Sequence, residues 1–392
     1  MKKKISFDKY RLLAPGPVPL SSEVRKELSE EMIHHRTPKF DKTLQEVLKG
    51  LKWVFQTQQP VFIHSATGSG AMESALINCL SPGDEVLAIV SGKFGERWRK
   101  MAQSFGYKVH SLEVPWGQKL PLEKVEESLR TLPQLKAVLC QACETSTATL
   151  HPIQELAQLT SDHSQALLMV DAITALGATK LPMDEWQLDV VVAGSQKAFQ
   201  IPTGLSFVAL SERAWQRALK ATTPRFYFDL RLEHAANQKG ETFFSSSVAL
   251  IRALRPVLES LSGDGLNRSI ARSQELMKKT HQILETLNLS LFSQAPSPSV
   301  TALMVPEGID GGRWRQHLEE KYQITLMGGQ DQLKGKILRV GHLGAISDED
   351  MQALGWALAL SLNDLKPQSL SSSQLAELET QLGSAMPSLS PQ

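Results

Sequence analysis

A lysine and an aspartate each follow a short apolar run, in places where their side chains can do chemistry. Lys197 stands in Gly194-Ser195-Gln196-Lys197-Ala198, just after the run 190–193, and Asp171 follows the run 166–170. Partial burial after a strand lowers the pKa of a lysine amine towards the range in which it is a nucleophile. A carboxylate after another core strand can pair with a protonated pyridine nitrogen and so make that ring an electron sink. Taken singly, such a lysine is more often a solvated surface residue, and such an aspartate is often a helix N-cap.

A turn of small residues, Ser65-Ala66-Thr67-Gly68-Ser69-Gly70, leads into an apolar helix predicted over 71–80. Glycines let the backbone approach an anion, and the free amides and dipole at a helix start favour phosphate. The spacing matches neither the GxxxxGK[ST] loop nor the GxGxxG fingerprint. The turn therefore predicts a phosphate site of another kind, with a plain helix start as the alternative.

The elements that must position these residues alternate between strands and helices from residue 84 onwards. Apolar runs alternate with amphipathic stretches, which is the βαβ rhythm of a mostly parallel sheet covered by helices. Strands are predicted over 85–90, 108–114, 135–140, 166–170 and 190–193, and helices over 96–105 and 122–132. Ligands of such sheets lie at the carboxyl ends of the strands, which places Asp171 and Ser195 at the predicted site.

The second half of the chain has a different pattern, with long helices predicted over 248–261 and 268–287 before strands over 300–305 and 337–340. This pattern predicts a smaller α+β domain. The predicted organisation is an N-terminal arm over 1–20, a large domain over 21–255, a small domain over 256–364 and a tail over 365–392. The tail is rich in Ser, Gln and Pro, so we expect it to be loosely held, although 375–378 can form a short helix.

Charge and hydropathy argue against nucleic acid or a membrane as partner. The 392 residues include 42 Lys and Arg against 41 Asp and Glu, a formal net charge of +1. Met1-Lys2-Lys3-Lys4 resembles the start of a signal peptide, but charged residues follow where an apolar stretch is required. No run reaches the roughly 18 uncharged apolar residues that spanning a bilayer needs. We therefore expect a soluble cytoplasmic protein.

The three cysteines, Cys79, Cys140 and Cys143, are too few for a disulfide framework and agree with a reducing compartment. Cys140 and Cys143 have the spacing of a redox or metal motif, but no second Cys or His pair stands nearby to complete a zinc site. We interpret them as two thiols at the end of a buried strand, and no metal site is predicted.

These features belong to a series of motifs in which the chain, from about residue 10 to residue 362, resembles the class V aminotransferases. The resemblance is to the alanine–glyoxylate and serine–glyoxylate or serine–pyruvate enzymes. The motifs, in order, are Leu13-Ala14-Pro15-Gly16-Pro17, His34-His35-Arg36-Thr37-Pro38, Thr67-Gly68-Ser69-Gly70 with Met72-Glu73, Gly92-Lys93-Phe94-Gly95-Glu96-Arg97-Trp98, Glu144-Thr145-Ser146-Thr147, Val170-Asp171-Ala172, Gly194-Ser195-Gln196-Lys197-Ala198 and Leu338-Arg339-Val340-Gly341-His342-Leu343-Gly344. The resemblance implies an α/β fold, that of the fold type I transferases that use pyridoxal phosphate (PLP).

The family pattern also implies a role for individual residues. It makes Lys197 the lysine that carries PLP as a Schiff base, and Asp171 the partner of the pyridine nitrogen. Arg339 matches the arginine that holds the substrate's α-carboxylate, a task suited to a planar fork. The remaining cofactor residues are Thr67, Gly68, Ser69 and Gln196 at the phosphate, Phe94 stacked on the ring and Thr147 near the phenolic oxygen.

In this family the phosphate is also contacted by the other subunit of a homodimer, which here implies Thr242 and Ser245. The usual pattern has threonine and proline where this chain has Ser245-Ser246, so a hydroxyl is kept. Ala148 stands where glycine is common, and Phe94 replaces a tryptophan of the animal enzymes. The last two changes bear on which substrates are used.

The implied activity is a PLP-dependent transfer of an amino group from alanine or serine to glyoxylate or pyruvate, with ping-pong kinetics. One alternative is a lyase or cysteine desulfurase of the same fold, but a desulfurase needs a cysteine on a mobile loop and none follows Cys143. Another is a non-catalytic, partner-binding protein, since some bacterial relatives carry a hydrogenase-subunit label. The chain has no cysteine set for an iron–sulfur cluster.

Overall fold

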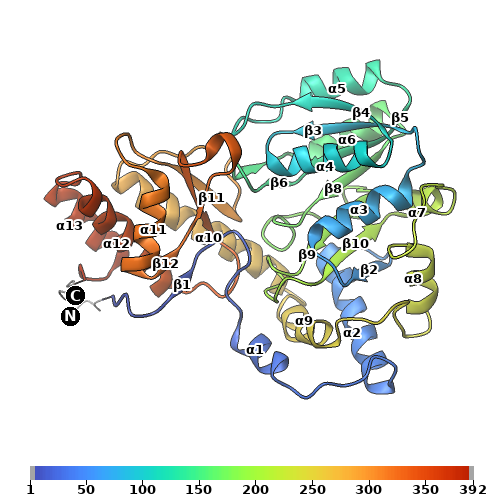
Figure 1. The fold of residues 1–392 in the computed structure, drawn as a ribbon, viewed down its shortest axis with the longest axis horizontal. Helices are drawn as coiled ribbons and strands as arrows, with labels where there is room; N and C mark the ends of the chain where they lie inside the picture. The colour runs from blue at the N-terminus through green and yellow to red at the C-terminus, as the bar shows by residue number, and fades with distance from the viewer. Residues whose placement is uncertain (1–4, 388–392) are drawn as a thin grey trace.

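A seven-stranded sheet organises the larger part of the chain (Figure 1). The computed structural model describes residues 5–387, so 1–4 of the predicted arm and 388–392 of the predicted tail lie outside the described residues. The strand order is β2-β10-β9-β8-β5-β3-β4, and β10 alone runs antiparallel to its neighbours. In this order the strands are Val61–His64, Ser206–Leu210, Val190–Gly194, Leu167–Asp171, Leu135–Gln141, Glu85–Val90 and Lys108–Glu113.

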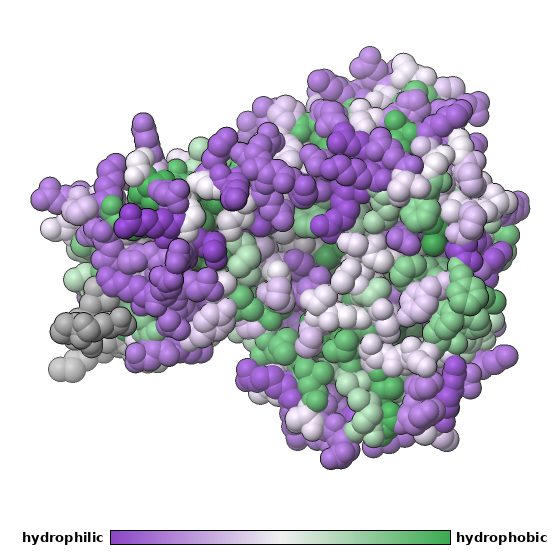
Figure 2. All heavy atoms as spheres, in the orientation of Figure 1, coloured by the Kyte–Doolittle hydropathy of each residue, from purple (hydrophilic) through white to green (hydrophobic). Residues whose placement is uncertain are grey.

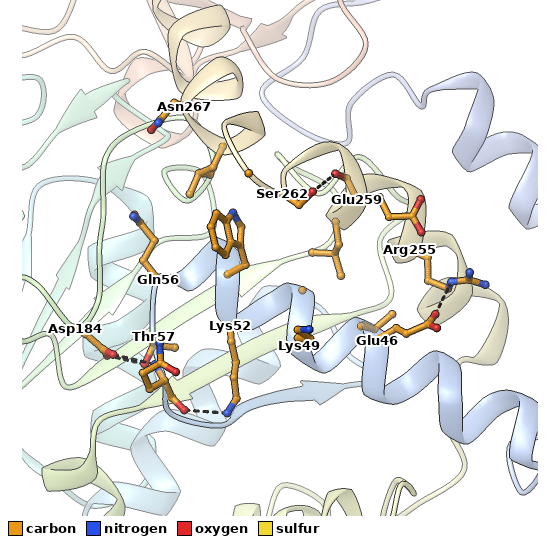
Figure 3. A pocket seen from close by; sticks show the side chains of 17 residues that line it. Glu46, Lys49, Lys52, Gln56, Thr57, Asp184, Arg255, Glu259, Ser262 and Asn267 are labelled. Atoms are coloured by element: carbon orange, nitrogen blue, oxygen red, sulfur yellow. Dashed lines mark hydrogen bonds and ion pairs between the residues drawn. The ribbon is translucent and has the colours of Figure 1, made fainter.

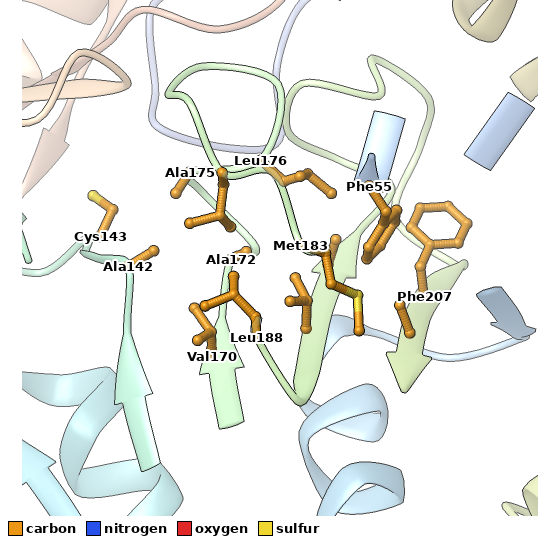
Figure 4. Close-up of a cluster of buried hydrophobic side chains, with 14 of the residues drawn as sticks. Phe55, Ala142, Cys143, Val170, Ala172, Ala175, Leu176, Met183, Leu188 and Phe207 are labelled. Atoms are coloured by element: carbon orange, nitrogen blue, oxygen red, sulfur yellow. The ribbon is translucent and has the colours of Figure 1, made fainter. Parts of the chain in front are cut away.

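Helices cover both faces of this sheet, which is why the inner strands are nearly continuous apolar runs. α3, α4, α7 and α8 pack on one face, and α1, α2, α5, α6 and α9 pack on the other. In chain order, α1 to α9 span Ser22–Leu28, Pro38–Phe55, Gly68–Cys79, Lys93–Ser104, Leu122–Thr131, Ile153–His163, Glu212–Ala218, Leu230–Asn237 and Val248–Ser260. Figure 4 shows part of the core on the second face, where Phe55 and Phe207 lie among smaller apolar side chains such as Val170 and Ala172.

The smaller part of the chain has its own core and lies to one side of the sheet (Figure 1). Its sheet has the order β11-β14-β13, and the N-terminal strand β1 pairs in parallel with β12. Trp314 and Trp356 are fully buried in its core together with Leu13 of the arm. The elements are β1 Arg11–Leu12, α10 Gly265–Thr286, β11 Val300–Met304, α11 Gly311–Tyr322, β12 Ile324–Thr325, β13 Met327–Gly328, η1 Asp331–Leu333, β14 Ile337–Gly341, α12 Asp348–Leu365 and α13 Ser372–Leu382.

Apolar side chains on both sides of the predicted boundary at 255/256 share the core of the larger part. Helix α9 continues through Pro256, and Val257 and Leu258 are buried in the core of the larger part. The next helix, α10, begins at Gly265. Leu261 and Leu266, after α9, belong to the same core, so the boundary at 255/256 remains a prediction.

Helix α13 occupies much of the segment that the composition predicts to be a loosely held tail. Ser371 and Gln374 form a capping box at its start, and Leu378 is fully buried in the core of the smaller part. Ser384 accepts a hydrogen bond from the indole of Trp356 at 3.1 Å. Up to Ser384 this segment is therefore packed helix and turn, because one apolar stripe anchors an otherwise polar sequence. Within residues 5–387, no helix has both the length and the apolar character needed to cross a bilayer.

The packing of α13 predicts that Leu378→Ala destabilises the protein by about 2–5 kcal/mol, the usual cost of emptying a fully buried leucine site. Chemical denaturation followed by fluorescence of the buried tryptophans measures the loss. Glu377→Ala, at an exposed site on the same helix, is the matched control and should change the free energy of unfolding by less than about 0.5 kcal/mol. Equal stability of the two variants would contradict the packing described for α13.

Candidate active site

The ends of β8 and β9, two neighbouring parallel strands, bring Asp171 and Lys197 to the same edge of the sheet. Asp171 is the last residue of β8, and Lys197 lies in the turn that follows β9. Both side chains are buried, at 5% and 9% exposure. The Lys197 amine donates a hydrogen bond to the backbone oxygen of Pro15. An amine and a carboxylate are thus held together out of water, as the strand-end pattern predicts.

Burial changes the protonation of both groups. It lowers the pKa of Lys197 to about 8, with the charge of Arg339 acting in the same direction and Cys143 and Asp171 opposing it. Burial raises the pKa of Asp171 to about 7, while a hydrogen bond from the Ile173 amide to Oδ1 at 2.9 Å opposes the rise. At pH 7 roughly a tenth of the lysine is therefore neutral and nucleophilic, far more than for an ordinary lysine.

The N-terminal arm covers Lys197. A Cβ on Gly16 would lie 2.3 Å from the Lys197 amine, and Gly16 has φ +132°, so only glycine fits between them. Gly341, just after Arg339 on β14, is packed as tightly, because a Cβ there would lie 2.1 Å from the Ala14 oxygen. The arm is thus wedged between the lysine and the smaller part. The resemblance included this stretch without giving it a role, and its glycine between two prolines is the signal that could have found it.

The turn at Thr67, Gly68 and Ser69 lies beside the end of β8. Thr67 is the exposed N-cap residue of α3, and its hydroxyl makes no capping hydrogen bond. A Cβ on Gly68 would lie 2.4 Å from Ile173, two residues after Asp171. The side-chain oxygen of Gln196 lies near Gly194, as Ile173 does, and is buried without a hydrogen-bond partner. Free donors and acceptors are thus gathered next to the lysine and the aspartate.

A short hairpin, β6 (Cys143–Glu144) and β7 (Thr149–Leu150), positions Phe94 and Thr147. The fully buried Glu144 accepts hydrogen bonds from the amides of Phe94 at 3.1 Å and Gly95 at 3.0 Å, and so caps α4. Burial raises the pKa of this carboxyl. The Thr147 hydroxyl donates to Thr149 at 3.0 Å. The motif that contains Glu144 does not reveal its contact with the Phe94 amide, because that contact depends on how the hairpin packs against α4.

Ala148, in the same hairpin, has φ 57° and is completely buried. This left-handed conformation costs an L-residue with a Cβ roughly 1–2 kcal/mol, and glycine avoids the cost. The structure therefore explains why glycine is common at this position. It also shows that alanine can be accommodated there without a change of hairpin.

Arg339 is a buried cation that reaches from the smaller part to the larger one. It is 6% exposed on β14, and Nη1 donates to the Thr145 oxygen at 3.1 Å while Nη2 donates to the Gly328 oxygen at 2.9 Å. Within residues 5–387 no carboxylate lies within ion-pair distance of it. Burial lowers the pKa of the guanidinium, and the charges of Glu144 and Cys143 oppose the shift. Such a group is suited to a carboxylate brought in by a ligand.

Thr242 and Ser245 are not brought to these residues within one chain. The Thr242 hydroxyl donates to the Phe244 oxygen at 2.7 Å, and Ser245 is exposed. Both line a small hollow with Ser65. No hydrogen bond joins either of them to another predicted site residue in the described part of the chain.

A cavity of about 840 Å³ between α2 and α9 contains none of the predicted site residues. Trp53 lines it. Figure 3 shows Thr57 hydrogen-bonded to Asp184, at 2.6 Å, and Arg255 paired with Glu46, at 3.1 Å. Because these polar groups already have partners, we place the chemistry at Lys197. The three cysteines are free and buried, and residues 5–387 contain no cluster of three or more His, Cys, Asp or Glu suited to a metal.

A lysine and an aspartate on adjacent strand ends, beside a helix start and a buried arginine, define a site that fits PLP and an amino acid. The class V aminotransferase family model matches residues 22–345, and the chain therefore belongs to this family and is a PLP-dependent transaminase.

The comparisons with individual proteins agree. The chain is 40% identical to a protein named soluble hydrogenase, small subunit, of a Synechococcus species over 91% of this chain and 94% of that one. It is 35% identical to the L-aspartate–glyoxylate aminotransferase of Paracoccus denitrificans, over 86% of this chain and 87% of the other. The structure of an alanine–glyoxylate aminotransferase from Nostoc matches with a TM-score of 0.86 and 29% identity, covering 90% and 96% of the two chains. The predicted family, α/β fold and cofactor are confirmed.

The buried amine predicts that PLP attaches covalently to Lys197 and does so faster as the pH rises. Because the pKa is lowered to about 8, half of the amine is neutral near pH 8, whereas an ordinary lysine reaches that point only near pH 10.5. Borohydride trapping at a series of pH values, followed by peptide mapping, should place the pyridoxyl group on Lys197 with a midpoint near pH 8. A label on another lysine would show that the site is misassigned.

Proposed function

We propose that the chain transfers the amino group of a small amino acid, alanine or serine, to glyoxylate or pyruvate with ping-pong kinetics. The observation that carries the proposal is the buried Arg339 guanidinium, which has no carboxylate partner in the described part of the chain. Both substrates of such an enzyme carry a carboxylate next to the reacting carbon, so one arginine serves both half-reactions. The names of two relatives, aspartate–glyoxylate and serine–glyoxylate aminotransferase, favour glyoxylate as acceptor.

The residues of the chain divide the work. Arg339 holds the α-carboxylate and so fixes the amino acid relative to Lys197. Lys197 would hold PLP covalently, and its amine, once the amino acid has displaced it, would carry the α-proton from the amino acid to the cofactor. Asp171 would be the charged partner that keeps the pyridine nitrogen protonated. When bound, PLP supplies the electron sink that makes the α-proton removable.

The working unit we propose is a homodimer in which Thr242 and Ser245 complete the phosphate site of the other subunit. These hydroxyls do not reach the Lys197 site within one chain, and aromatic side chains beside them are exposed, Phe226 by 75% and Phe243 by 37%. Tyr227 stacks on Phe244 at 4.9 Å in the same cluster. Exposed aromatic groups of this size are typical of a protein interface. Hydrophobic surface also gathers over α2, α8 and α9 (Figure 2).

Two other activities have less support. A desulfurase would need a reactive cysteine, whereas burial raises the pKa of Cys143 to about 11 and leaves the thiol protonated. The hydrogenase name of a relative suggests a partner-binding role, and absorbance of the purified protein separates that role from catalysis. A yellow protein whose band shifts with an amino acid is an enzyme. We place the protein in the cytoplasm, where three free thiols remain reduced.

Removal of the Arg339 guanidinium should weaken the binding of both substrates and leave the binding of PLP unchanged. We expect Arg339→Ala to keep its PLP absorbance while KM for alanine and for glyoxylate rises by at least about 30-fold, equivalent to roughly 2 kcal/mol. Arg313→Ala, at an exposed arginine of the smaller part, is the charge-matched control. Unchanged KM values in Arg339→Ala would remove the proposed role.

Shared sites predict complementation between damaged subunits. A Lys197→Ala chain and a Thr242→Ala/Ser245→Ala chain are each expected to be nearly inactive alone. Their heterodimer should contain one undamaged site, so mixing after partial denaturation should recover about a quarter of wild-type activity, half the chains being in heterodimers with one good site of two. Sedimentation of a fully active monomer would contradict the shared-site arrangement.

A further inference from the structure

The predicted phosphate ligands do not balance the charge of a phosphate. All of them are neutral, namely Thr67, Gly68, Ser69, Gln196, Thr242 and Ser245. A phosphate monoester carries close to two negative charges at neutral pH, and the start of α3 supplies only about half a positive charge. Lys197 is committed to the covalent bond. A site built from these groups alone therefore leaves much of the phosphate charge without a cation.

Arg97 contacts two of the predicted cofactor residues. Its Nη1 donates a hydrogen bond to the Ser69 hydroxyl at 2.9 Å, and its guanidinium carbon lies 4.8 Å from the centre of the Phe94 ring. The two contacts come from different helices, α3 and α4. Arg97 also lies close enough to Asp171 to lower the pKa of that carboxyl. A single arginine thus stands between the residues predicted for the phosphate, the ring face and the ring nitrogen.

Arg97 has no carboxylate partner, unlike the other cations of α4. Lys93 pairs with Asp331, Arg99 with Glu113 and Lys100 with Glu96. Within residues 5–387 no carboxylate lies within ion-pair distance of Arg97, and its side chain is exposed. The arginine is thus free to bind an anion that arrives from solvent.

The hydrogen bond to Ser69 also suits an anion at this place. The Ser69 oxygen accepts from Arg97, so the hydroxyl hydrogen remains available for another acceptor. An anion that takes this hydrogen lies beside a guanidinium whose other N–H groups make no hydrogen bond in the described residues. Arginine and serine can then act together, as a planar fork and a hydroxyl do at many phosphate sites.

We propose that Arg97 is a further cofactor-binding residue, which neutralises and hydrogen-bonds the phosphate together with Ser69. The proposal rests on the proposed cofactor site at Lys197. It gives the phosphate a positively charged ligand, the Arg97 guanidinium, beside ligands that are otherwise neutral. It also separates the recognition of the phosphate from that of the ring, because pyridoxal lacks the phosphate and should not need Arg97.

The test compares two ligands on two variants. Dissociation constants of PLP and of pyridoxal are measured by absorbance titration for wild type, Arg97→Met and Arg99→Met. Methionine keeps the length of the side chain and suits a helix, and Arg99→Met removes an equal charge two residues away. We expect Arg97→Met to weaken PLP at least about tenfold and pyridoxal by less than about twofold, with Arg99→Met unchanged. Arg97→Lys should recover part of the loss, and inorganic phosphate should compete less well in Arg97→Met.

Each other outcome has a definite meaning. Equal weakening of PLP and pyridoxal would show that Arg97 supports only Phe94 or the fold, and unchanged PLP binding would show that it does not meet the phosphate. Either result overturns the proposal while leaving the cofactor site intact, provided that borohydride traps PLP on Lys197 in the wild type. If the wild type itself fails to take PLP at Lys197, the proposed function fails first.

Discussion

A backbone carbonyl of the N-terminal arm shields the Lys197 amine from water. Several distant parts of the chain must pack together to hold this carbonyl in place. Pro15 supplies the oxygen, and Gly16 must be glycine because a side chain there would collide with the amine. The arm in turn depends on Gly341 for close packing against β14. A depressed lysine pKa therefore does not follow from the lysine's own strand alone. It requires the sheet, the arm and the smaller part to meet at one point.

The same burial explains the distribution of charge around the site. Arg339 and Lys197 are two buried cations; burial lowers the pKa of both, and the charge of Arg339 lowers that of Lys197 further. The nearby acids, Asp171 and Glu144, have raised pKa values because they are buried too. Burying these ionisable groups without partners lowers the stability of the ligand-free protein. A ligand with a pyridine nitrogen or a carboxylate supplies the missing partners, and its binding stabilises the folded state. Cofactor and substrate therefore provide the partners that the buried charges of the site lack.

The sequence predicted what depends on local pattern and missed what depends on distant pairing. The apolar runs ending at Asp171 and before Lys197 predicted that these two residues lie at one edge of the sheet, because parallel strands share a carboxyl edge. Strand β10 was not predicted, because its identity depends on antiparallel pairing with β2, far away in the chain. The relation of Arg97 to Ser69 depends on how α4 lies against α3, which no spacing within one helix reveals. The motifs of the known family supplied most of the remaining residues, whose roles the strand pattern alone could not assign.

The parallel pairing of β1 with β12 has a consequence for the order in which the protein is made. Arg11 and Leu12 are translated more than 300 residues before their partners, Ile324 and Thr325. Contacts so distant in sequence close late, since the whole intervening chain must first be available. The lid over the lysine therefore forms after the sheet that carries the lysine. Until β1 pairs with β12, the Lys197 amine lacks the contact with Pro15 that shields it in the folded chain.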